Sequence, residues 1–136
     1  MKIYADHAAT TAVSDTAMAA MLPCFQGIYA NPSSLHSPGQ RAAEKLAAAR
    51  AIFARNLHAD PREITFTSGG SEADNQALRT AAALGEKRGK RHIVSTKFEH
   101  HAVLHTLQAL EREGFEVTLL DIPPDGVVTA EQVRDA

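Results

Sequence analysis

The sequence predicts an α/β protein with three layers, in which helices cover both faces of a mainly parallel sheet. Short segments rich in β-branched residues alternate with amphipathic helical segments between residues 64 and 120. Hydrophobic residues make up 44% of the chain and charged residues 22%, which is typical of a globular protein. At 136 residues the chain is long enough to bury a core, so residues 1–136 are expected to belong to a single domain.

The first quarter of the chain is expected to hold one helix behind an extended lead-in. Residues 1–13 show no helical periodicity and are predicted to be extended. Ser14 is a candidate N-cap for a helix over about 16–25. The single cysteine, Cys24, lies near the end of that helix and excludes an internal disulfide framework, so we expect a buried small hydrophobe there.

A loop over 27–34 leads into the longest predicted helix. Ser37 as N-cap, Pro38 at the first helical position and Gln40 at the third form a capping box. Apolar residues then recur every three or four positions to about residue 57. This amphipathic helix is expected to cover a face of the sheet.

The centre of the chain predicts a strand, a glycine turn and a helix. Residues 64–67 alternate apolar and β-branched side chains, Gly69 and Gly70 permit a tight turn, and a helix is expected from Ser71 to about residue 87. Such a helix start offers unpaired N–H groups and a partial positive charge to an anion. An ordinary capping box, with Ser71 as N-cap and Asp74 three residues on, is the alternative.

The second half of the chain continues the alternation of strands and helices. The predicted elements are a strand at 92–95, a helix at about 100–112, a strand at 115–120, a turn at 123–126 and a short helix opened by a Thr129–Gln132 capping box. His100 would follow the carboxyl end of a parallel strand, at the edge where open α/β sheets bind ligands. Its imidazole could there stack on a flat cofactor or cap its own helix.

Composition and spacing exclude several classes of function. A net charge of −2 argues against a nucleic-acid surface, and the basic cluster at 87–91 is interpreted as a solvated helix end. No apolar run is long enough to span a bilayer, and the cytoplasm is the expected compartment. His101 and His105 share a helical spacing, but Ala102 replaces the glutamate of zinc proteases and no further ligand lies nearby, so no metal site is expected.

Four motifs in order resemble the cysteine desulfurases, pyridoxal-phosphate enzymes of fold type I that supply sulfur for iron–sulfur clusters. They are Tyr4–Thr11 (YADHAATT), Asn31–His36 (NPSSLH), Thr67–Asn75 (TSGGSEADN) and Glu99–Leu104 (EHHAVL). Many relatives have Ala-Thr where this chain has Gly70-Ser71, a change that keeps the hydroxyl. The resemblance covers essentially the whole chain and places it in the large cofactor-binding domain.

The resemblance implies a site and a reaction. Pyridoxal 5′-phosphate would rest its phosphate on Gly70 and Ser71, and His100 would stack on the ring and assist proton transfer. Asn31 would lie near the carboxylate of L-cysteine, which would be converted into L-alanine and a protein-bound persulfide. A homodimer is implied, together with a sulfur-acceptor or iron–sulfur scaffold protein as partner.

The same resemblance implies that several catalytic groups lie beyond residue 136. These are the cofactor-binding lysine, an aspartate, an arginine and the nucleophilic cysteine, a role that Cys24 does not inherit. No lysine of the chain falls in the matching context. We therefore expect an N-terminal third that is inactive alone. The alternatives are a selenocysteine lyase, another class-V aminotransferase, or a non-catalytic chain that acts as a binding module or as half of a split enzyme.

Overall fold

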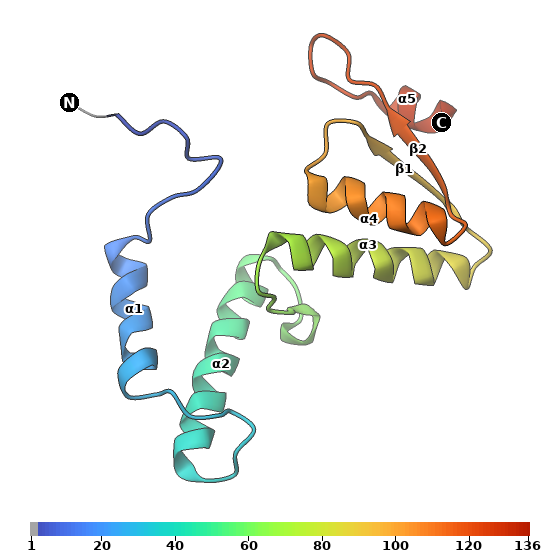
Figure 1. Cartoon of the computed structure of the whole chain (residues 1–136). Helices are drawn as coiled ribbons and strands as arrows, with labels where there is room; N and C mark the ends of the chain where they lie inside the picture. Colours follow the sequence, from blue (N-terminus) through green and yellow to red (C-terminus); the bar gives the residue numbers. More distant parts are fainter. Residues whose placement is uncertain (1–2) are drawn as a thin grey trace. The chain divides into compact units, whose positions relative to one another are not determined.

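The computed structural model describes residues 3–136, which fall into two compact units, 3–65 and 66–136 (Figure 1). The first unit holds two α-helices and a 3₁₀ turn. The second holds three α-helices and a two-stranded parallel sheet. The α/β class predicted from the sequence is confirmed, with the sheet confined to the second unit.

The lead-in to the first helix is not simply extended. Residues 7–9 form a turn, in which Asp6 O accepts the N–H of Ala9 at 3.2 Å. The hydroxyl of Tyr4 bridges this turn by donating to Asp6 O at 2.8 Å and to Thr10 O at 3.1 Å. The first two residues of the predicted lead-in lie outside the described part of the chain.

Helix α1 spans Asp15–Gln26, close to the predicted bounds, and Ser14 Oγ accepts the N–H of Ala17 at 3.2 Å as its N-cap. No residue of α1 is buried. Cys24 is a free cysteine and is only half-buried, so the expected burial is reached in part. The N-cap at Ser14 is confirmed.

Helix α2 spans Ser37–Asn56, but its N-cap differs from the predicted one. The cap is His36, whose Nδ1 accepts the N–H of Gly39 at 3.2 Å, so Ser37 is the first helical residue and the predicted capping box is wrong. The helix begins one residue earlier than predicted, because the imidazole of His36 supplies the hydrogen-bond acceptor that the Ser37 hydroxyl was expected to provide. That α2 covers a sheet face stays a prediction.

The predicted strand at residues 64–67 is wrong. A 3₁₀ turn, η1 (Pro61–Glu63), precedes it, and Ile64 is extended at φ −90° and ψ 117°, yet no described strand pairs with the segment. Local propensity favours extension, whereas a strand exists only through its ladder partner. The η1 turn itself is held by Asp60, whose pKa is lowered chiefly by the hydrogen bond from the Arg62 side chain.

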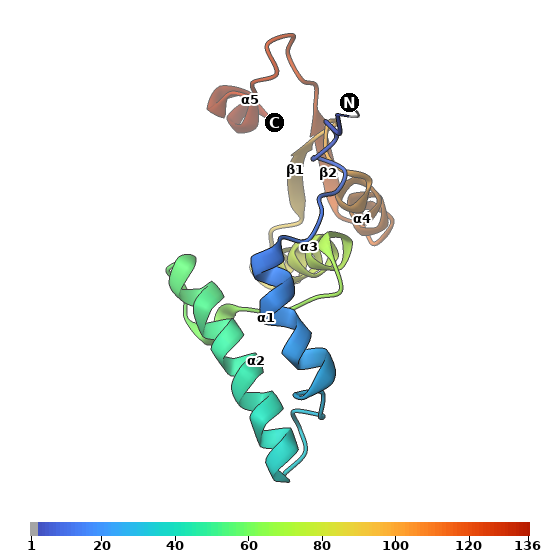
Figure 2. The ribbon, with the colours of Figure 1, turned by 90° about the vertical axis from the view of Figure 1, so that its left-hand side faces the viewer.

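The second unit contains a succession of helix, strand, helix and strand around one small core. Its elements are α3 (Gly70–Glu86), β1 (His92–Thr96), α4 (His101–Arg112) and β2 (Glu116–Leu120). The strands pair in parallel with His92 opposite Glu116 and Thr96 opposite Leu120. Helix α4 packs against both α3 and β2, and the two views in Figures 1 and 2 agree on this placement.

The core of this unit joins α3, α4 and β1 with the residue that precedes β2. Ala82 of α3, Leu110 of α4 and Phe115 before β2 are at most 7% exposed, and Ile93 of β1 packs on them. Arg91 covers the open side, because its guanidinium carbon lies 4.7 Å from the centre of the Phe115 ring. The same guanidinium donates to Glu113 O at 2.9 Å and pairs with Glu86.

The chain after β2 matches its predicted elements. Gly126 N donates to Pro123 O at 2.8 Å and closes the expected turn. Helix α5 (Ala130–Asp135) begins with the predicted capping box, in which Thr129 and Gln132 exchange hydrogen bonds. Over residues 3–136, no helix combines the length and apolarity that crossing a membrane requires.

Candidate cofactor-binding site

The first turn of α3 has no side-chain cap. Its N-cap is Gly69, which is extended at φ 168° and ψ 178°, and the helix begins at Gly70 rather than at Ser71. The Ser71–Asp74 capping box is therefore wrong: Ser71 is the second helical residue, and its carbonyl accepts from Asn75 Nδ2 at 3.0 Å. The leading N–H groups of α3 are left to solvent or to a ligand, as an anion site requires.

The two glycines leave open space at this helix end. A Cβ built on Gly69 or on Gly70 meets no atom within 4 Å. A bound group can therefore approach the main chain without displacing protein atoms. The turn thus fits a phosphate both in donors and in room.

The carboxylate of Glu72 is engaged by the residue that precedes the glycine turn. Its Oε2 accepts from Ser68 Oγ at 2.6 Å and from Ser68 N at 2.7 Å. The Ser68 hydroxyl, followed by the Ser68 backbone N–H, lowers the pKa of Glu72 below its ordinary value. The negative charge on the first turn of α3 therefore has two hydrogen-bond donors, both on Ser68, the residue before the N-cap.

His100 occupies the corresponding position at the start of α4. It is the N-cap of that helix, and its Nδ1 accepts the N–H of Ala102 at 3.1 Å. The neutral ring consequently carries its proton on Nε2, which is a hydrogen-bond donor. The capping role weighed from the sequence is observed, and it leaves Nε2–H as the second polar group of the ring.

One cavity joins the two helix starts. Figure 1 shows that α3 and α4 begin at the same end of the unit, and a cavity of about 380 Å³ lies there. It is lined from α3 by Ser71, Asn75 and Arg79, which are spaced four residues apart. From α4 and its N-cap it is lined by His100, His101, Ala102, His105, Thr106 and Ala109. The structure thus brings together Ser71 and His100, which the sequence predicted to share an edge, in a space of the usual size for a ligand pocket.

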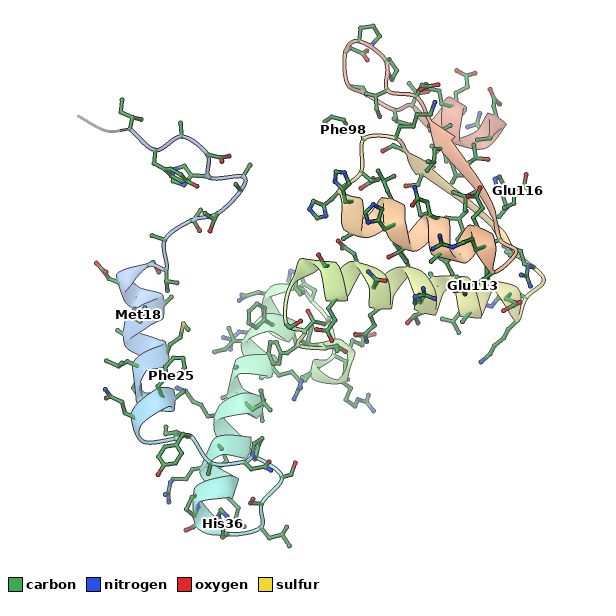
Figure 3. All side chains as sticks on the ribbon, in the orientation of Figure 1. Met18, Phe25, His36, Phe98, Glu113 and Glu116 are labelled. Atoms are coloured by element: carbon green, nitrogen blue, oxygen red, sulfur yellow. The ribbon has the colours of Figure 1, made fainter. Side chains whose placement is uncertain are left out.

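Two further histidines line the cavity. The rings of His101 and His105 meet edge to face with centroids 5.6 Å apart, and the rings of His100 and His101 are 6.2 Å apart. Within the part of the chain that the structure describes, no group of three or more His, Cys, Asp or Glu side chains is arranged to hold a metal ion. The loop ahead of α4 exposes Phe98, which is labelled in Figure 3 and is 82% exposed.

The cavity wall includes a cation that the sequence reasoning missed. Arg79 lines the cavity and pairs with Glu113 at 3.1 Å, across the seam between α3 and α4. Both side chains are about half exposed, so the pair contributes little to stability. A sequence signal for this cation exists: residues four apart lie on one face of a helix, so Asn75 and Arg79 share the face of α3 that carries Ser71.

Asn31 lies in the first unit, in the loop before α2. Its Oδ1 accepts the N–H of Ser33 at 2.9 Å, and its carbonyl accepts the N–H of Ser34 at 3.0 Å. Because the amide oxygen is engaged, the side chain presents its NH₂ group as a donor. The loop is packed tightly on α2, since a Cβ on Gly39 would lie 2.4 Å from Ser34 O.

The arrangement matches a known family over the whole described chain. The family model for class-V aminotransferases covers residues 3–136. The chain belongs to the class-V aminotransferase family.

Two curated members of the family are similar to the chain over almost all of its length. An IscS-type protein of Bacillus subtilis (strain 168) is 47% identical over 135 residues, which cover 99% of this chain and 35% of that protein. The cysteine desulfurase IscS of Clostridium botulinum (strain Kyoto / Type A2) is 44% identical over 99% of this chain and 34% of its own. The chain spans about a third of the length of these relatives. The resemblance read from the four motifs is confirmed.

Solved structures of the family share the fold. A NifS-like protein superposes with a TM-score of 0.91 at 38% identity, over 99% of this chain and 37% of that chain. SspA, solved in complex with cysteine, has a TM-score of 0.87 at 37% identity, over 96% of this chain and 38% of its own. The expected placement in fold type I agrees with these likenesses.

Proposed function

We propose that this chain supplies the phosphate- and ring-binding part of a pyridoxal-phosphate-dependent cysteine desulfurase. That enzyme would convert L-cysteine into L-alanine and sulfur held as a persulfide on a protein cysteine. The single observation that carries the proposal is the cavity shared by Ser71 and His100 in a class-V aminotransferase chain. The names of its relatives, and the cysteine complex of SspA, support the choice of reaction and substrate.

The phosphate would be held at the start of α3. The backbone N–H groups of Gly70 and Ser71 and the Ser71 hydroxyl are the donors, and the helix dipole adds a partial positive charge. The missing side chains of Gly69 and Gly70 leave the approach open. The residues present therefore fit the phosphate end of the cofactor.

The flat ring of the cofactor would lie against His100. Capping fixes the imidazole, because rotation of the ring would break its bond with Ala102 N. The Nε2–H of the fixed ring can then donate to an acceptor on the cofactor or the substrate. When bound, pyridoxal phosphate supplies the electron sink for breaking bonds next to an amino group.

Asn31 is proposed to receive the carboxylate of L-cysteine. Its amide NH₂ is the available donor, since its Oδ1 is occupied by Ser33 N. The close packing of Gly39 on Ser34 holds this loop, so the donor direction is fixed before substrate arrives.

Turnover requires groups that the described residues do not provide in the expected context. The lysine, aspartate, arginine and nucleophilic cysteine implied by the resemblance have no assigned counterpart here, and Cys24 is excluded from the last role. We propose that the chain binds the cofactor without catalysing turnover alone. A homodimer, a sulfur-acceptor or iron–sulfur scaffold protein as partner, and a cytoplasmic location belong to the same proposal.

Cofactor binding tests the proposal directly. The chain is titrated with pyridoxal phosphate, and binding is followed by the absorbance and fluorescence of the cofactor. Ser71→Ala should weaken binding about tenfold, because it removes a hydrogen bond to a charged group. Ser95→Ala on β1, outside the cavity, is the matched control and should bind like the wild type. Equal binding by the wild type and Ser71→Ala, or none by either, would refute the assignment.

Activity is tested by supplying the rest of the enzyme. The chain is mixed with a polypeptide that corresponds to the remaining two thirds of the Bacillus subtilis relative, and L-alanine is measured after addition of L-cysteine and a thiol. We expect alanine from the mixture and none from either part. Alanine from L-selenocysteine alone would indicate a selenocysteine lyase, and cofactor binding with no turnover in any mixture would indicate a binding module.

A further inference from the structure

The turn that precedes α3 is restrained by hydrogen bonds to a carboxylate of the helix itself. Glu72 is the third residue of α3, and its Oε2 accepts both the hydroxyl and the backbone N–H of Ser68, at 2.6 and 2.7 Å. In a capping box the third helical residue reaches back to the N-cap N–H. Here it reaches one residue further, to the position before Gly69, and so spans the whole glycine turn.

The turn needs such a restraint because glycine lacks one of its own. Gly69 and Gly70 have no Cβ and no neighbouring atom within 4 Å of a built Cβ, so packing does not hold them. Gly also has the largest backbone freedom to lose on ordering. Apart from the Glu72 carboxylate, the turn has one further side-chain bond, from Thr67 Oγ1 to Gly69 O at 3.1 Å.

Because Glu72 is charged, the position of its carboxylate affects how well an anion binds at the start of α3. An ionised carboxylate on the first turn of a helix interacts well with the dipole, but it repels an anion bound at the same end. The two Ser68 donors engage Oε2 and stabilise the ionised form. The carboxylate that restrains the turn is therefore already paired with donors of the turn itself.

We propose that Glu72 is a positioning residue for the phosphate-binding turn: by holding Ser68 it fixes Gly69 and presents the N–H groups of Gly70 and Ser71 to the ligand. This inference rests on the proposed function, since it assigns a role within the same site. Glu72 does not touch the ligand. It acts through the conformation of the turn.

The direction in which one substitution changes the affinity for anions separates this role from a simple charge effect. Glu72→Gln keeps the size of the side chain and removes its charge. If Glu72 were only a nearby negative charge, the variant would bind anions more tightly. If Glu72 holds the turn, the variant binds them more weakly, because a neutral acceptor makes a weaker bond to Ser68.

The experiment compares the wild type, Glu72→Gln and Asp74→Asn in titrations with inorganic phosphate and with pyridoxal phosphate. Asp74 is the matched control, a carboxylate on the same helix that has no hydrogen bond to the turn in the described chain. We expect Glu72→Gln to weaken binding of both ligands about fivefold, and Asp74→Asn to leave it unchanged or to tighten it by less than about twofold. Binding by Glu72→Gln as tight as the wild type, or tighter, would overturn the proposal.

Amide hydrogen exchange gives a second readout that needs no ligand. We expect exchange at residues 68–72 to be faster in Glu72→Gln, and exchange in β1 to be unchanged, which shows that the variant is folded. Ser68→Ala removes one of the two bonds and should be intermediate. Unchanged exchange at residues 68–72 would contradict the inference. If the wild type bound neither ligand, the proposed function would fail, while faster exchange in Glu72→Gln would still confirm the restraint on the turn.

Discussion

Two helices of this chain start at a histidine side chain. His36 Nδ1 caps α2 by accepting from Gly39 N at 3.2 Å, and His100 Nδ1 caps α4 by accepting from Ala102 N at 3.1 Å. Figure 3 labels His36 at the start of α2. Ser, Thr, Asp and Asn are the usual residues at this position, so a sequence pattern directs attention to Ser37 instead. At His100 the cap also fixes the ring that is proposed to contact the cofactor.

Capping and ring stacking at His100 can be separated by two substitutions. His100→Asn keeps a good N-cap and removes the ring, so the stability of α4 should be retained while pyridoxal phosphate binds about three- to tenfold more weakly. His100→Phe keeps a flat ring and removes the cap, so it should lose about 1 kcal/mol of stability and retain most of the affinity. Cofactor titration and urea unfolding measure the two effects.

His101→Gln is the matched control for this pair of variants. His101 is the neighbouring histidine and lines the same cavity, but it is not the N-cap. If His101→Gln lost more affinity than His100→Asn, the ring-contacting histidine would have to be reassigned to position 101.

At the scale of elements, the loop that carries Asn31 depends on Gly39 in the first turn of α2. Gly39 is buried, and a Cβ there would lie 2.4 Å from Ser34 O, 2.7 Å from Ser34 Cβ and 2.9 Å from Asn31 O. None of these atoms is the end of a flexible side chain. The close approach of loop and helix therefore requires glycine at this position.

We expect Gly39→Ala to displace the loop and to lower the free energy of unfolding by about 1–3 kcal/mol, the usual cost of overpacking. Gly27→Ala is the control, because its Cβ would meet only Pro23 O, at the ordinary distance of 3.7 Å. Urea unfolding gives the stability, and the amide NMR shifts of residues 31–34 report the position of the loop. Identical shifts in Gly39→Ala and the wild type would contradict the expectation.

Elements whose signals are local could be predicted from the sequence. The strands β1 and β2, helix α4, the turn at 123–126 and the Thr129–Gln132 capping box all lie within two residues of their expected bounds. The strand expected at 64–67 failed because strand formation depends on a partner that the segment itself does not encode. The Arg91 contact with Phe115 and the hydrogen bond that Ser68 donates to Glu72 could not be predicted either, since each depends on a side-chain rotamer.

At the scale of the molecule, stability in residues 66–136 depends on a small core at the seam of α3, α4 and the sheet. Leu107 is the largest fully buried side chain among the described residues, at 1% exposure. The exposed ends of the same seam are joined by Arg79 and Glu113, the latter labelled in Figure 3. Polar contacts on the surface add little, so burial of a few leucines dominates.

Leu107→Ala should therefore destabilise this unit by about 2–5 kcal/mol through lost burial and the cavity that remains. Phe98→Ala removes a larger side chain from the same unit, but that side chain is 82% exposed and the change should be nearly neutral. Hydrogen exchange in α4 and β2 measures the change in stability caused by each variant. Equal effects of the two variants would show that the seam is not the stabilising core.

The candidate site could be located from sequence because its two ends are helix starts, and helix starts leave local signals. Glycines before α3 and a histidine before α4 marked both ends, although the strand at 64–67 from which their common sheet edge was predicted does not form. The groove between them could not be predicted, because Arg79 and Thr106 enter it only through the packing of α3 on α4.

The bond between His100 and Ala102 has a consequence for which groups the ring can recognise. The lone pair on Nδ1 already serves the helix, so an in-plane hydrogen bond to another molecule has to use Nε2–H. The start of α4 therefore discriminates by polarity, because a partner must offer a lone pair there and a second N–H or O–H donor would find no acceptor on the ring.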